Sequence, residues 1–565
     1  MKKYLLFIAL LFFYRGVKAS DRSGVKLDSL LTKQQTENLY MLAKVWGFLK
    51  YHHPNVAKGN SSFDEELFKI MQPISNAAPA EKRNELLLNW INSLGDETGY
   101  KKAGELPEKD VHIKPDIGWI NDKHLFSDAI INKLNSIYAH RNRSDNAYIK
   151  LLPGVLNPGF DGEEKYPAMT GDDDGLRMLA LFRYWNIIEY FYPSKYLIKD
   201  NWDTVLKEYI PRFAADRNSL GYKLNCLKLI SGIHDTHASI SGDKDLGTYF
   251  GKNYTVVKAR VIQGKLIVTL IVDDELAKHE SIQVGDEILT LNGKTITQWH
   301  KDMEDILCAS NPSAADRNFA SAFLLRGNGD SLAITYEHDG VIKNGSLKLY
   351  PMQTVNAASM KKYYEGPTYK LLNDSVGYIT MATIKASDLK IIFKTFENTK
   401  GIVIDIRNYP SEFMPFAMAE YIKPTPSPFV RFTNGNIDNP GLFTYKYYTS
   451  NGSKNKKYYK GRIIILVDER TQSQAEYTTM ALRTAPNAIV MGSQTAGADG
   501  NVSMIHFPGG FGSYISGIGI FYPDGKETQG IGIVPDIEVK PTKEGIKKGA
   551  DELLEKAVQY IAAGK

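Results

Sequence analysis

The sequence predicts a multidomain protein with an α/β core, preceded by a helical region and a β-rich block. Three changes of pattern along the 565 residues carry this prediction. Apolar residues recur at helical spacing up to about residue 245, and short β-rich runs with tight-turn signals fill 250–350. From about 365 to 545, buried strands alternate with helices, a pattern typical of a parallel sheet with crossover helices.

The helical region contains an internal repeat. At a constant offset of 139 residues, the two copies match without a gap along the first copy's residues 46–96. The matched pairs are Trp46 with Trp185, Tyr51 with Tyr190, Pro54 with Pro193, Asp64 with Asp203, Leu67 with Leu206, Ile91 with Ile230, and Asp96 with Asp235. Two copies indicate a duplicated helical unit, because a solenoid usually needs three or more. His234 and His237 fall on Gly95 and Thr98, so helix packing alone does not explain these two imidazoles.

The middle and last parts of the chain supply the expected strands. In the β-rich block, runs at 256–261 and 266–272 precede the segment 284–296, whose Asn292-Gly293 pair is a tight-turn signal. Further along, we expect strands at 376–381, 401–407, 463–468 and 488–491, with a helix at 474–484 between the last two. The segment 423–459 is rich in Pro, Gly, Tyr and Asn, so we expect a long insertion or loop there.

Residues 1–19 have the features of a signal peptide. Lys2 and Lys3 precede an apolar run, and Val17-Lys18-Ala19 gives a small-residue cleavage site. No later run reaches the roughly 18 apolar residues of a membrane span, so we expect an exported protein, periplasmic or secreted. The same segment holds four basic and no acidic residues, so the formal charge of +5 falls to about +1 in the mature chain. This balance gives no support to a nucleic-acid partner.

The sequence gives no sign of a metal or organic cofactor. The chain has no CxxC or HExxH motif, and its 11 histidines lack metal-ligand spacing. Cys226 and Cys308 are the only cysteines, and one disulfide between them is possible in an oxidising compartment. We therefore expect no cofactor, and the redox state of the two thiols stays open.

Ser473 is the candidate nucleophile. It follows a buried strand and directly precedes a helix, whose unpaired backbone N–H groups can stabilise an oxyanion. A structural alternative fits the same residues, since the segment 473–476, Ser-Gln-Ala-Glu, is also a capping box. The Gly-x-Ser-x-Gly elbow of the α/β-hydrolases is absent from the chain. The local sequence therefore leaves both roles open.

Four ordered motifs resemble those of the C-terminal processing (tail-specific) proteases, a family of serine peptidases. The segment 466–476 resembles their nucleophile segment, in which the catalytic Ser stands three residues before an acidic residue. The other three are 401–408, similar to the GxxxDxRxN strand, 490–497, similar to the vGexTfGKG turn, and 530–537, similar to the closing GxGIxPDI. The segment 284–296 resembles the GDxIxxxNG of a PDZ domain. The resemblance implies a ClpP/crotonase-like α/β core, an inserted PDZ-like domain and Ser473 as the nucleophile.

The resemblance departs from the bacterial family at the base. That family uses a Ser–Lys dyad, but the Lys position of the turn is Ala498 in this chain. The tricorn-like branch instead uses a His from an upstream segment, and residues 233–239 resemble that segment with His237 at the position of the base. The repeat comparison singles out the same residue. His234 is a neighbouring alternative, and His506 in the strand after the turn is a third.

The group that orients the base is expected near the closing motif. The tricorn-like branch has a Glu shortly before its Pro-Asp pair, where this chain has Gln529, with Glu527 two residues earlier. Only Glu527 can carry charge, and such an acid acts on the His directly or through a second Ser. Asp235 is the alternative, although its match with Asp96 favours a helix-end role.

The resemblance also implies an oxyanion hole built from two backbone N–H groups. One is expected from Gln474 and the other from the loop after Arg407. The family has a Gly pair in that loop, and Ser411 is the residue chosen here for the second donor. Absence of both the Lys and the Gly pair leaves a catalytically inactive protein as an alternative.

The predicted function is that of an exported serine endopeptidase, a hydrolase of extended or unfolded polypeptides. The substrate would be captured by the PDZ-like domain, through its C-terminus, and cleaved through an acyl-enzyme on Ser473 with His237 as the general base. The alternative is an inactive peptide- or ligand-binding protein on the same scaffold. The expected boundaries are 1–19 signal peptide, 20–165 first helical copy, 166–248 second copy with His237, 249–352 PDZ-like domain, 353–545 peptidase core and 546–565 C-terminal helix.

Overall fold

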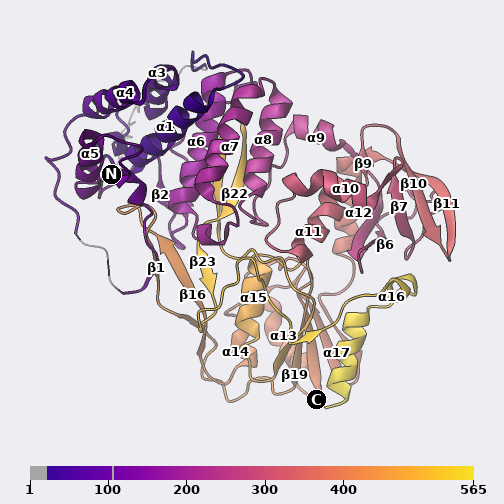
Figure 1. The fold of residues 1–565 in the computed structure, drawn as a ribbon. Helices are drawn as coiled ribbons and strands as arrows, with labels where there is room; N and C mark the ends of the chain where they lie inside the picture. Colours follow the sequence, from indigo (N-terminus) through magenta and orange to yellow (C-terminus); the bar gives the residue numbers. More distant parts are fainter. Residues whose placement is uncertain (1–21, 105–106, 108, 565) are drawn as a thin grey trace, which may run out of the picture.

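The computed structural model describes residues 22–104, 107 and 109–564, so the predicted signal peptide lies outside the described residues. A helical region comes first, a β-rich block (the β block, 249–352) second and the α/β core last (Figure 1). Within the described ranges, no helix is long and apolar enough to cross a membrane. Cys226 and Cys308 are both buried and unpaired.

Two long helices with almost no exposed residues form the centre of the helical region. They are α1 (Lys33–His52) and α6 (Asp174–Phe191), which pack against each other. Around them lie α2 (Pro54–Ala57), α3 (Phe63–Ser75), α4 (Ala80–Ser93), α5 (Asp128–Ala139), α7 (Trp202–Ala215), α8 (Ser219–Ser231) and α9 (Lys244–Phe250). Because these helices bury α1 and α6 on every side, both lack the polar stripe of a surface helix.

The same contacts recur at the offset of 139 residues. Trp46 Nε1 donates to the carbonyl of Phe63 at 3.2 Å, and Trp185 Nε1 donates to the carbonyl of Trp202 at 2.7 Å. After α4 the Asp96 carboxylate accepts from the N–H of Thr98 at 3.0 Å. After α8 the Asp235 carboxylate accepts from the N–H of His237 at 2.9 Å. The two copies therefore share their helix packing and the turn that follows their last helix.

The β block is an antiparallel sheet in the order β11-β10-β7-β6-β5, with β5 at one edge. Its strands are β5 (Val257–Ile262), β6 (Lys265–Ile271), β7 (Glu287–Leu291), β8 (Lys294–Thr295), β10 (Ser331–His338) and β11 (Val341–Lys348). Asn292 and Gly293, both with positive φ, form the predicted tight turn between β7 and β8. Helices α10 (Ile296–Met303), α11 (Pro312–Asn318) and α12 (Met352–Tyr363) and a small sheet of β4 (Asn253–Tyr254), β9 (Arg326–Gly327) and β12 (Tyr350–Pro351) complete it.

The core is a sheet in the order β13-β14-β15-β19-β20-β24. Its strands are β13 (Tyr369–Asn373), β14 (Val376–Thr380), β15 (Gly401–Asp405), β19 (Arg462–Val467), β20 (Ala488–Gly492) and β24 (Ile537–Glu538). All pairs except β13 with β14 are parallel, as the alternation of strands and helices predicted. This confirms the predicted α/β fold class.

Helices cover both faces of the core sheet, so its strands are apolar on both sides. Ile463 and Ile465 of β19 pack on the side of α13 (Leu389–Thr395), α14 (Ala419–Ile422) and α15 (Gln474–Leu482). Ile464 and Leu466 pack on the other side against α17 (Glu552–Ala562) (Figure 1). The alternation follows from the strand period of two, and it explains the continuous apolar run in the sequence.

The segment 423–459, expected to be a long insertion or loop, contributes β16 (Ser427–Gly435), β17 (Phe443–Tyr445) and β18 (Thr449–Asn451) to a second sheet. That sheet also contains β1 (Val111–Ile113) from the helical region and β23 (Gly519–Phe521) from the core. The C-terminal helix does not begin at 546, since α16 (Lys543–Lys547) ends before Gly549, whose φ of +68° breaks the helix.

A hairpin of the core lies against the helical region. It consists of β21 (Val502–Phe507) and β22 (Phe511–Ser516), and β22 is drawn among α6, α7 and α8 in Figure 1. The hydroxyl of Tyr222 donates to the carbonyl of Pro508 at 2.9 Å, and the ring of Tyr184 stacks on Phe507. The core and the helical region therefore share one buried apolar cluster.

A buried ion cluster lies beneath this hairpin. The Arg183 guanidinium contacts Asp64 at 2.8 Å and Glu163 at 3.0 Å, and it also donates to the carbonyl of His506 at 3.4 Å. Lys50 pairs with both carboxylates, and all four charged side chains are almost completely buried. Removal of one cation from such a cluster leaves a charge buried without a partner.

We predict that Arg183→Met destabilises the protein by roughly 3–5 kcal/mol, because Asp64 and Glu163 lose a buried partner. The measurement is the urea concentration at the unfolding midpoint. The matched control is Lys69→Met, which removes an exposed pair with Glu66 and should cost less than about 1 kcal/mol. Equal shifts of the two midpoints would contradict the role of the cluster.

Candidate active site

Ser473 occupies the turn between β19 and α15. Its backbone has φ 57° and ψ −124°, in the left-handed half of the map that residues other than Gly rarely adopt. Residues that only cap a helix have extended backbone, as Ser62 before α3 (φ −69°) and Asn201 before α7 (φ −62°) do. The conformation of Ser473 costs of order 1–3 kcal/mol and projects its half-buried side chain from a sharp strand-to-helix turn.

The carboxylate of Glu476 holds this turn. It is fully buried, and its Oε2 accepts from the backbone N–H groups of Ser473 and Ala498, both at 3.1 Å. Its Oε1 accepts from the N–H of Gly497 at 2.8 Å and from the Thr495 hydroxyl at 2.5 Å. Burial raises the pKa of Glu476, and these donors oppose the rise. Since every contact donates to it, the ionised form is the one that satisfies them.

The turn 495–500 runs beside the nucleophile. The N–H of Ser473 also donates to the carbonyl of Ala498 at 3.0 Å, which places the predicted Lys position directly against it. The methyl group of Ala498 is fully buried and cannot act as a base. The next residue, Asp499, is buried as well, and burial followed by the charge of Glu476 raises its pKa well above the usual range. Burial and the neighbouring charge therefore both disfavour the ionised form of Asp499.

The segment that carries His237 is tied to this turn. The Thr236 hydroxyl donates to the carbonyl of Ala496 at 3.0 Å, and the Thr236 N–H donates to the Ser310 hydroxyl of the β block at 2.8 Å. One residue of the helical region thus joins all three parts of the chain. His237 is the next residue, so the segment of the second helical copy that carries it lies against the turn 495–500.

The His237 imidazole is almost completely buried and contacts two groups through Nδ1. Nδ1 lies 2.9 Å from the Ser516 hydroxyl oxygen and 3.7 Å from Oδ1 of Asp235. Nε2 is buried and has no hydrogen-bond partner in the part of the chain that the structure describes. Burial lowers the pKa of His237, the Arg317 cation adds to the lowering, and Asp235 opposes it.

The predicted orienting residues lie elsewhere. The carboxylate of Glu527 accepts from the Tyr196 hydroxyl, and the Gln529 amide donates to the Tyr192 hydroxyl at 3.5 Å. Neither is hydrogen-bonded to His237 among the described residues, where Ser516 holds Nδ1 instead. The sequence missed Ser516, because a lone Ser at the end of a strand carries no signal of its own.

The two alternative histidines face other surroundings. His234 has φ 51°, at the position where Gly95 has φ 95° in the first copy, and its neighbouring charges are Lys199 and Asp200. His506 is half-buried in β21, near the ion cluster of the helical region. The charges around His506 are Lys165, Asp161, Arg183 and Glu163. Among these three histidines, His237 is the one whose neighbour in sequence, Thr236, bonds to the turn 495–500.

The two predicted oxyanion donors differ. The N–H of Gln474, at the first position of α15, donates to no acceptor within residues 22–104, 107 and 109–564. The N–H of Ser411 is engaged, because it donates to the carbonyl of Met381 at 3.0 Å. Gln474 also fastens the loop after β15, since its side chain donates to the carbonyl of Glu412 at 3.0 Å. The structure therefore leaves Gln474 available and does not offer Ser411 as the second donor.

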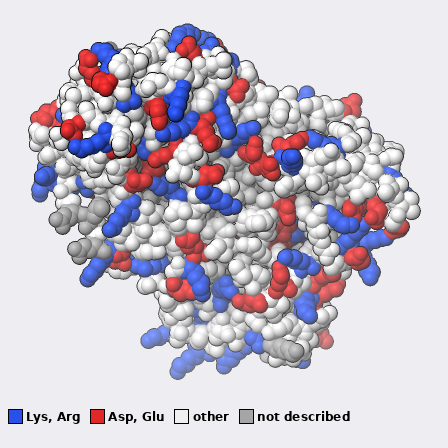
Figure 2. Space-filling model, in the orientation of Figure 1, with Lys and Arg blue, Asp and Glu red and all other residues white. Residues whose placement is uncertain are grey.

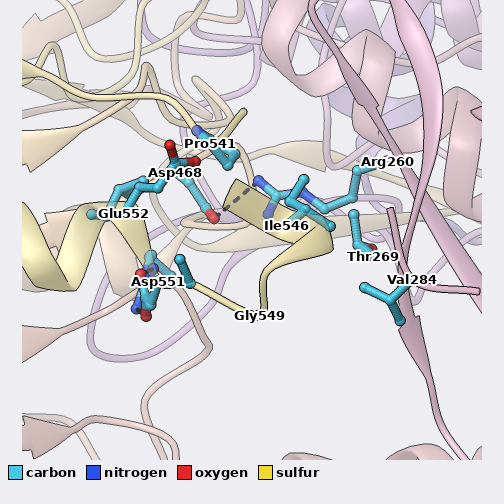
Figure 3. Close-up of a pocket in the computed structure, with 12 residues that line it drawn as sticks. Arg260, Thr269, Val284, Asp468, Pro541, Ile546, Gly549, Asp551 and Glu552 are labelled. Carbon is cyan, nitrogen blue, oxygen red and sulfur yellow. Dashed lines mark hydrogen bonds and ion pairs between the residues drawn. The ribbon is translucent and has the colours of Figure 1, made fainter. Parts of the chain in front are cut away.

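Two arginines of the β block hold the segment 468–472 before the nucleophile. Arg260 of β5 pairs with Asp468 at 3.3 Å and donates to Glu469 at 2.7 Å, and Figure 3 shows it pointing at Asp468 across a pocket of about 250 Å³. Arg317 of α11 donates to the carbonyl of Glu469 at 3.0 Å and to the Gln472 side chain at 2.8 Å. The position of the nucleophile turn is thus coupled to the β block.

The chain resembles known peptidases in sequence and in fold. Residues 375–539 match the model of peptidase family S41. Mature CPAF complexed with lactacystin is 14% identical, with a TM-score of 0.53 over 69% of this chain and 99% of that chain. A putative peptidase from Parabacteroides merdae is 16% identical, with a TM-score of 0.43 over 69% and 96%. The photosystem II D1 C-terminal processing protease is 17% identical, with a TM-score of 0.39 over 67% and 98%.

No curated protein sequence gives a significant match to the chain. The likeness to CPAF, at 14% identity, supports a common fold. The family match covers β14, β15, β19, α15 and β20. The nucleophile turn lies between two of these elements, β19 and α15. This match confirms the family that the four sequence motifs predicted. Residues 375–539 therefore form a domain that matches peptidase family S41, the family of the C-terminal processing proteases.

Proposed function

We propose that this chain is an exported serine endopeptidase that cleaves extended or unfolded polypeptides through an acyl-enzyme on Ser473, with His237 as the general base. The observation that carries the proposal is the left-handed backbone of Ser473, which an ordinary helix cap does not need. The buried Nε2 of His237, which lacks a partner among the described residues, supports it. Export is supported by the sequence of residues 1–19.

In the proposed reaction, the Ser473 oxygen attacks the carbonyl carbon of the scissile peptide bond while its proton passes to Nε2 of His237. The carbonyl oxygen becomes an oxyanion that the free N–H of Gln474 can stabilise. When the tetrahedral intermediate collapses, the C–N bond breaks and the imidazolium returns the proton to the leaving amine. Water then repeats the attack on the ester with the same base, which releases the second product and restores Ser473.

The proposed base and nucleophile are not hydrogen-bonded to each other in this structure, since Nε2 of His237 has no partner among the described residues. Proton transfer therefore requires a bridging water or a small closing movement when the substrate binds. The contacts of Thr236 with Ala496 and with Ser310 are where the helical region, the core and the β block meet. Closure about this junction would bring His237 to Ser473.

The β block supports the proposed peptide substrate. β5 lies at the edge of its sheet, where an extended chain can add as a further strand in the manner of PDZ domains. Arg260 on the same strand reaches the segment before Ser473, so a peptide added to β5 would lie near the site. Acidic and basic side chains are interspersed over the face in Figure 2, which suits a polypeptide better than a polyanion.

The decisive test is cleavage of an unfolded casein-type polypeptide together with covalent labelling by a fluorophosphonate. We expect Ser473→Ala to abolish both, and His237→Ala to lower both by at least about 10²-fold, since a general base contributes roughly 10²–10⁴-fold. The exposed residues Ser450 and His279 give matched controls, and Ser450→Ala and His279→Ala should retain both signals. A wild-type protein that neither cleaves nor labels would instead be an inactive binding protein.

The pH dependence of kcat/KM gives a second prediction. Burial and Arg317 lower the pKa of His237 from its ordinary value of 6.5, so the imidazole stays neutral and able to accept a proton below that pH. Activity should therefore persist as the pH falls through 6.5 and be lost only in more acidic buffer, where His237 gains its proton. An acid limb above pH 6.5 would argue against His237 as the base.

A third prediction concerns Glu476. In Glu476→Gln, one carboxylate oxygen becomes an NH₂ group that opposes the N–H donors of the turn. We expect a loss of roughly 1–3 kcal/mol in unfolding free energy and a large fall in the rate of fluorophosphonate labelling. Glu420→Gln, at an exposed position of α14, is the matched control. Unchanged labelling in Glu476→Gln would show that the turn does not depend on this carboxylate.

A further inference from the structure

The chain Asp235–Ser516–His237 is a buried polar network that the predicted catalytic set does not contain. The Ser516 hydroxyl lies 3.1 Å from Oδ1 of Asp235 and 2.9 Å from Nδ1 of His237. Asp235 is fully buried and Ser516 is 1% exposed, so water does not compete for these groups. Each hydrogen bond in the network can therefore be assigned from the donors and acceptors alone.

Asp235 accepts from several donors. Its Oδ2 accepts from the backbone N–H of Ser516 at 2.7 Å, and its Oδ1 accepts from the N–H of His237 at 2.9 Å. A buried carboxyl group with two N–H donors is satisfied in its ionised form. An ionised carboxylate has no proton to give, so the Ser516 hydroxyl must donate its single hydrogen to Oδ1 of Asp235.

The hydrogen on the imidazole follows from this assignment. Because the proton of Ser516 points to Asp235, its oxygen can only accept from Nδ1 of His237, 2.9 Å away. The neutral ring therefore carries its hydrogen on Nδ1 and a lone pair on Nε2. In the opposite tautomer, the oxygens of Ser516 and Asp235 would face each other without a hydrogen between them. Nε2 is the atom that has no partner among the described residues.

We propose that Asp235 and Ser516 are the positioning residues of this peptidase: acting in series, they hold His237 as the Nδ1–H tautomer so that Nε2 can accept the Ser473 proton. The proposal rests on the proposed function of Ser473 and His237. Asp235 would also stabilise the imidazolium that forms, since the charge lies 3.7 Å from Nδ1. Arg317 on α11 is the opposing charge near the ring, and it limits this effect.

The internal repeat separates the two roles of Asp235. In the first copy, Asp96 makes the same turn contact with the residue two positions later, but it bonds the Thr98 hydroxyl and lies on the surface. The turn is thus shared by both copies, whereas the contact with Ser516 occurs only in the second. The match with Asp96 favoured a helix-end role for Asp235, and it explains the bond from the N–H of His237 to Asp235. It does not explain the two bonds that Asp235 accepts from Ser516.

The hairpin β21–β22 delivers Ser516 to the ring. Its Ser513 hydroxyl accepts from the N–H of Ser239 at 3.2 Å, so the end of β22 lies along the segment 235–239. Ser516 thus comes from the core and Asp235 from the helical region, and both are fixed by the packing of the hairpin on α6 and α8. Ser513→Ala, which removes a hairpin contact without touching His237, is a matched control.

The test reads the tautomer directly. In full-length Ser473→Ala protein with ¹⁵N-labelled histidine, long-range ¹H–¹⁵N spectra distinguish a protonated Nδ1 from a protonated Nε2, and His237→Ala assigns the signal. We expect Nδ1 of His237 to be the protonated nitrogen. Ser516→Ala and Asp235→Asn should shift the ring toward the Nε2–H form, while Ser516→Thr and Ser513→Ala keep the Nδ1–H form. An Nε2–H form in the Ser473→Ala protein, or no change in Ser516→Ala, would overturn the proposal.

Kinetic measurements distinguish a positioning role of Ser516 and Asp235 from a purely structural one. In the Ser473-containing enzyme, Ser516→Ala and Asp235→Asn should lower kcat by roughly 10²-fold with little change in KM. Asp235→Asn should also move the acid limb of kcat/KM to lower pH, because the charge that favours the imidazolium is gone. An unmoved acid limb would contradict the role of Asp235. Since the spectra need no cleavage, an inactive wild-type protein with the expected tautomer would refute the peptidase reaction and leave the positioning network intact.

Discussion

The buried carboxylate of Glu476 is the constraint on which the nucleophile turn depends. It gathers the N–H groups of Ser473, Gly497 and Ala498 and the Thr495 hydroxyl, so two segments separated in sequence close around one charge. Because Glu476 is fully buried, these four hydrogen-bond donors are what stabilises its charge. The turn and the charge therefore stabilise each other, and together they hold Ser473 in its left-handed conformation. Glu476, which the sequence predicted as the acid of a capping box, is thus the centre of a larger hydrogen-bond network.

The other half of the site depends on how the helical region meets the core. His237 follows the last helix of the second copy, and Thr236 fixes that segment to the carbonyl of Ala496. The hairpin β21–β22 is buried against α6 and α8, over the cluster of Arg183, Asp64, Glu163 and Lys50. The cluster contacts the hairpin through the hydrogen bond from Arg183 to the carbonyl of His506. The same hairpin carries Ser516, which contacts the ring of His237.

The sequence predicts well whatever depends on local pattern. The core strands, α15, the turn at Asn292-Gly293 and the family follow from periodicity and short motifs. The sequence could not predict Ser516, because its role arises from a contact with His237 across 279 residues and a Ser has no local signature. It also missed β16 to β18, since these strands contain Pro and Asn and gain their stability by pairing with β1 and β23. For Ser411, only the structure reveals that its N–H is already bonded to the carbonyl of Met381.

Replacement of the Lys by Ala498 changes what the activity depends on. In a Ser–Lys dyad, both groups belong to neighbouring turns of one sheet, so the core alone can assemble the site. In this chain the backbone of Ala498 bonds to Ser473 and Glu476, and its side chain is a buried methyl group. Burial and the charge of Glu476 raise the pKa of the adjacent Asp499 well above its usual range. In the proposed mechanism, the core supplies Ser473 and the N–H of Gln474, and the base comes from the helical region. His237, Ser516 and Asp235 meet where the helical region packs on the hairpin. Any movement between the two parts thus acts on proton transfer directly, so substrate that closes this junction would also switch on the chemistry.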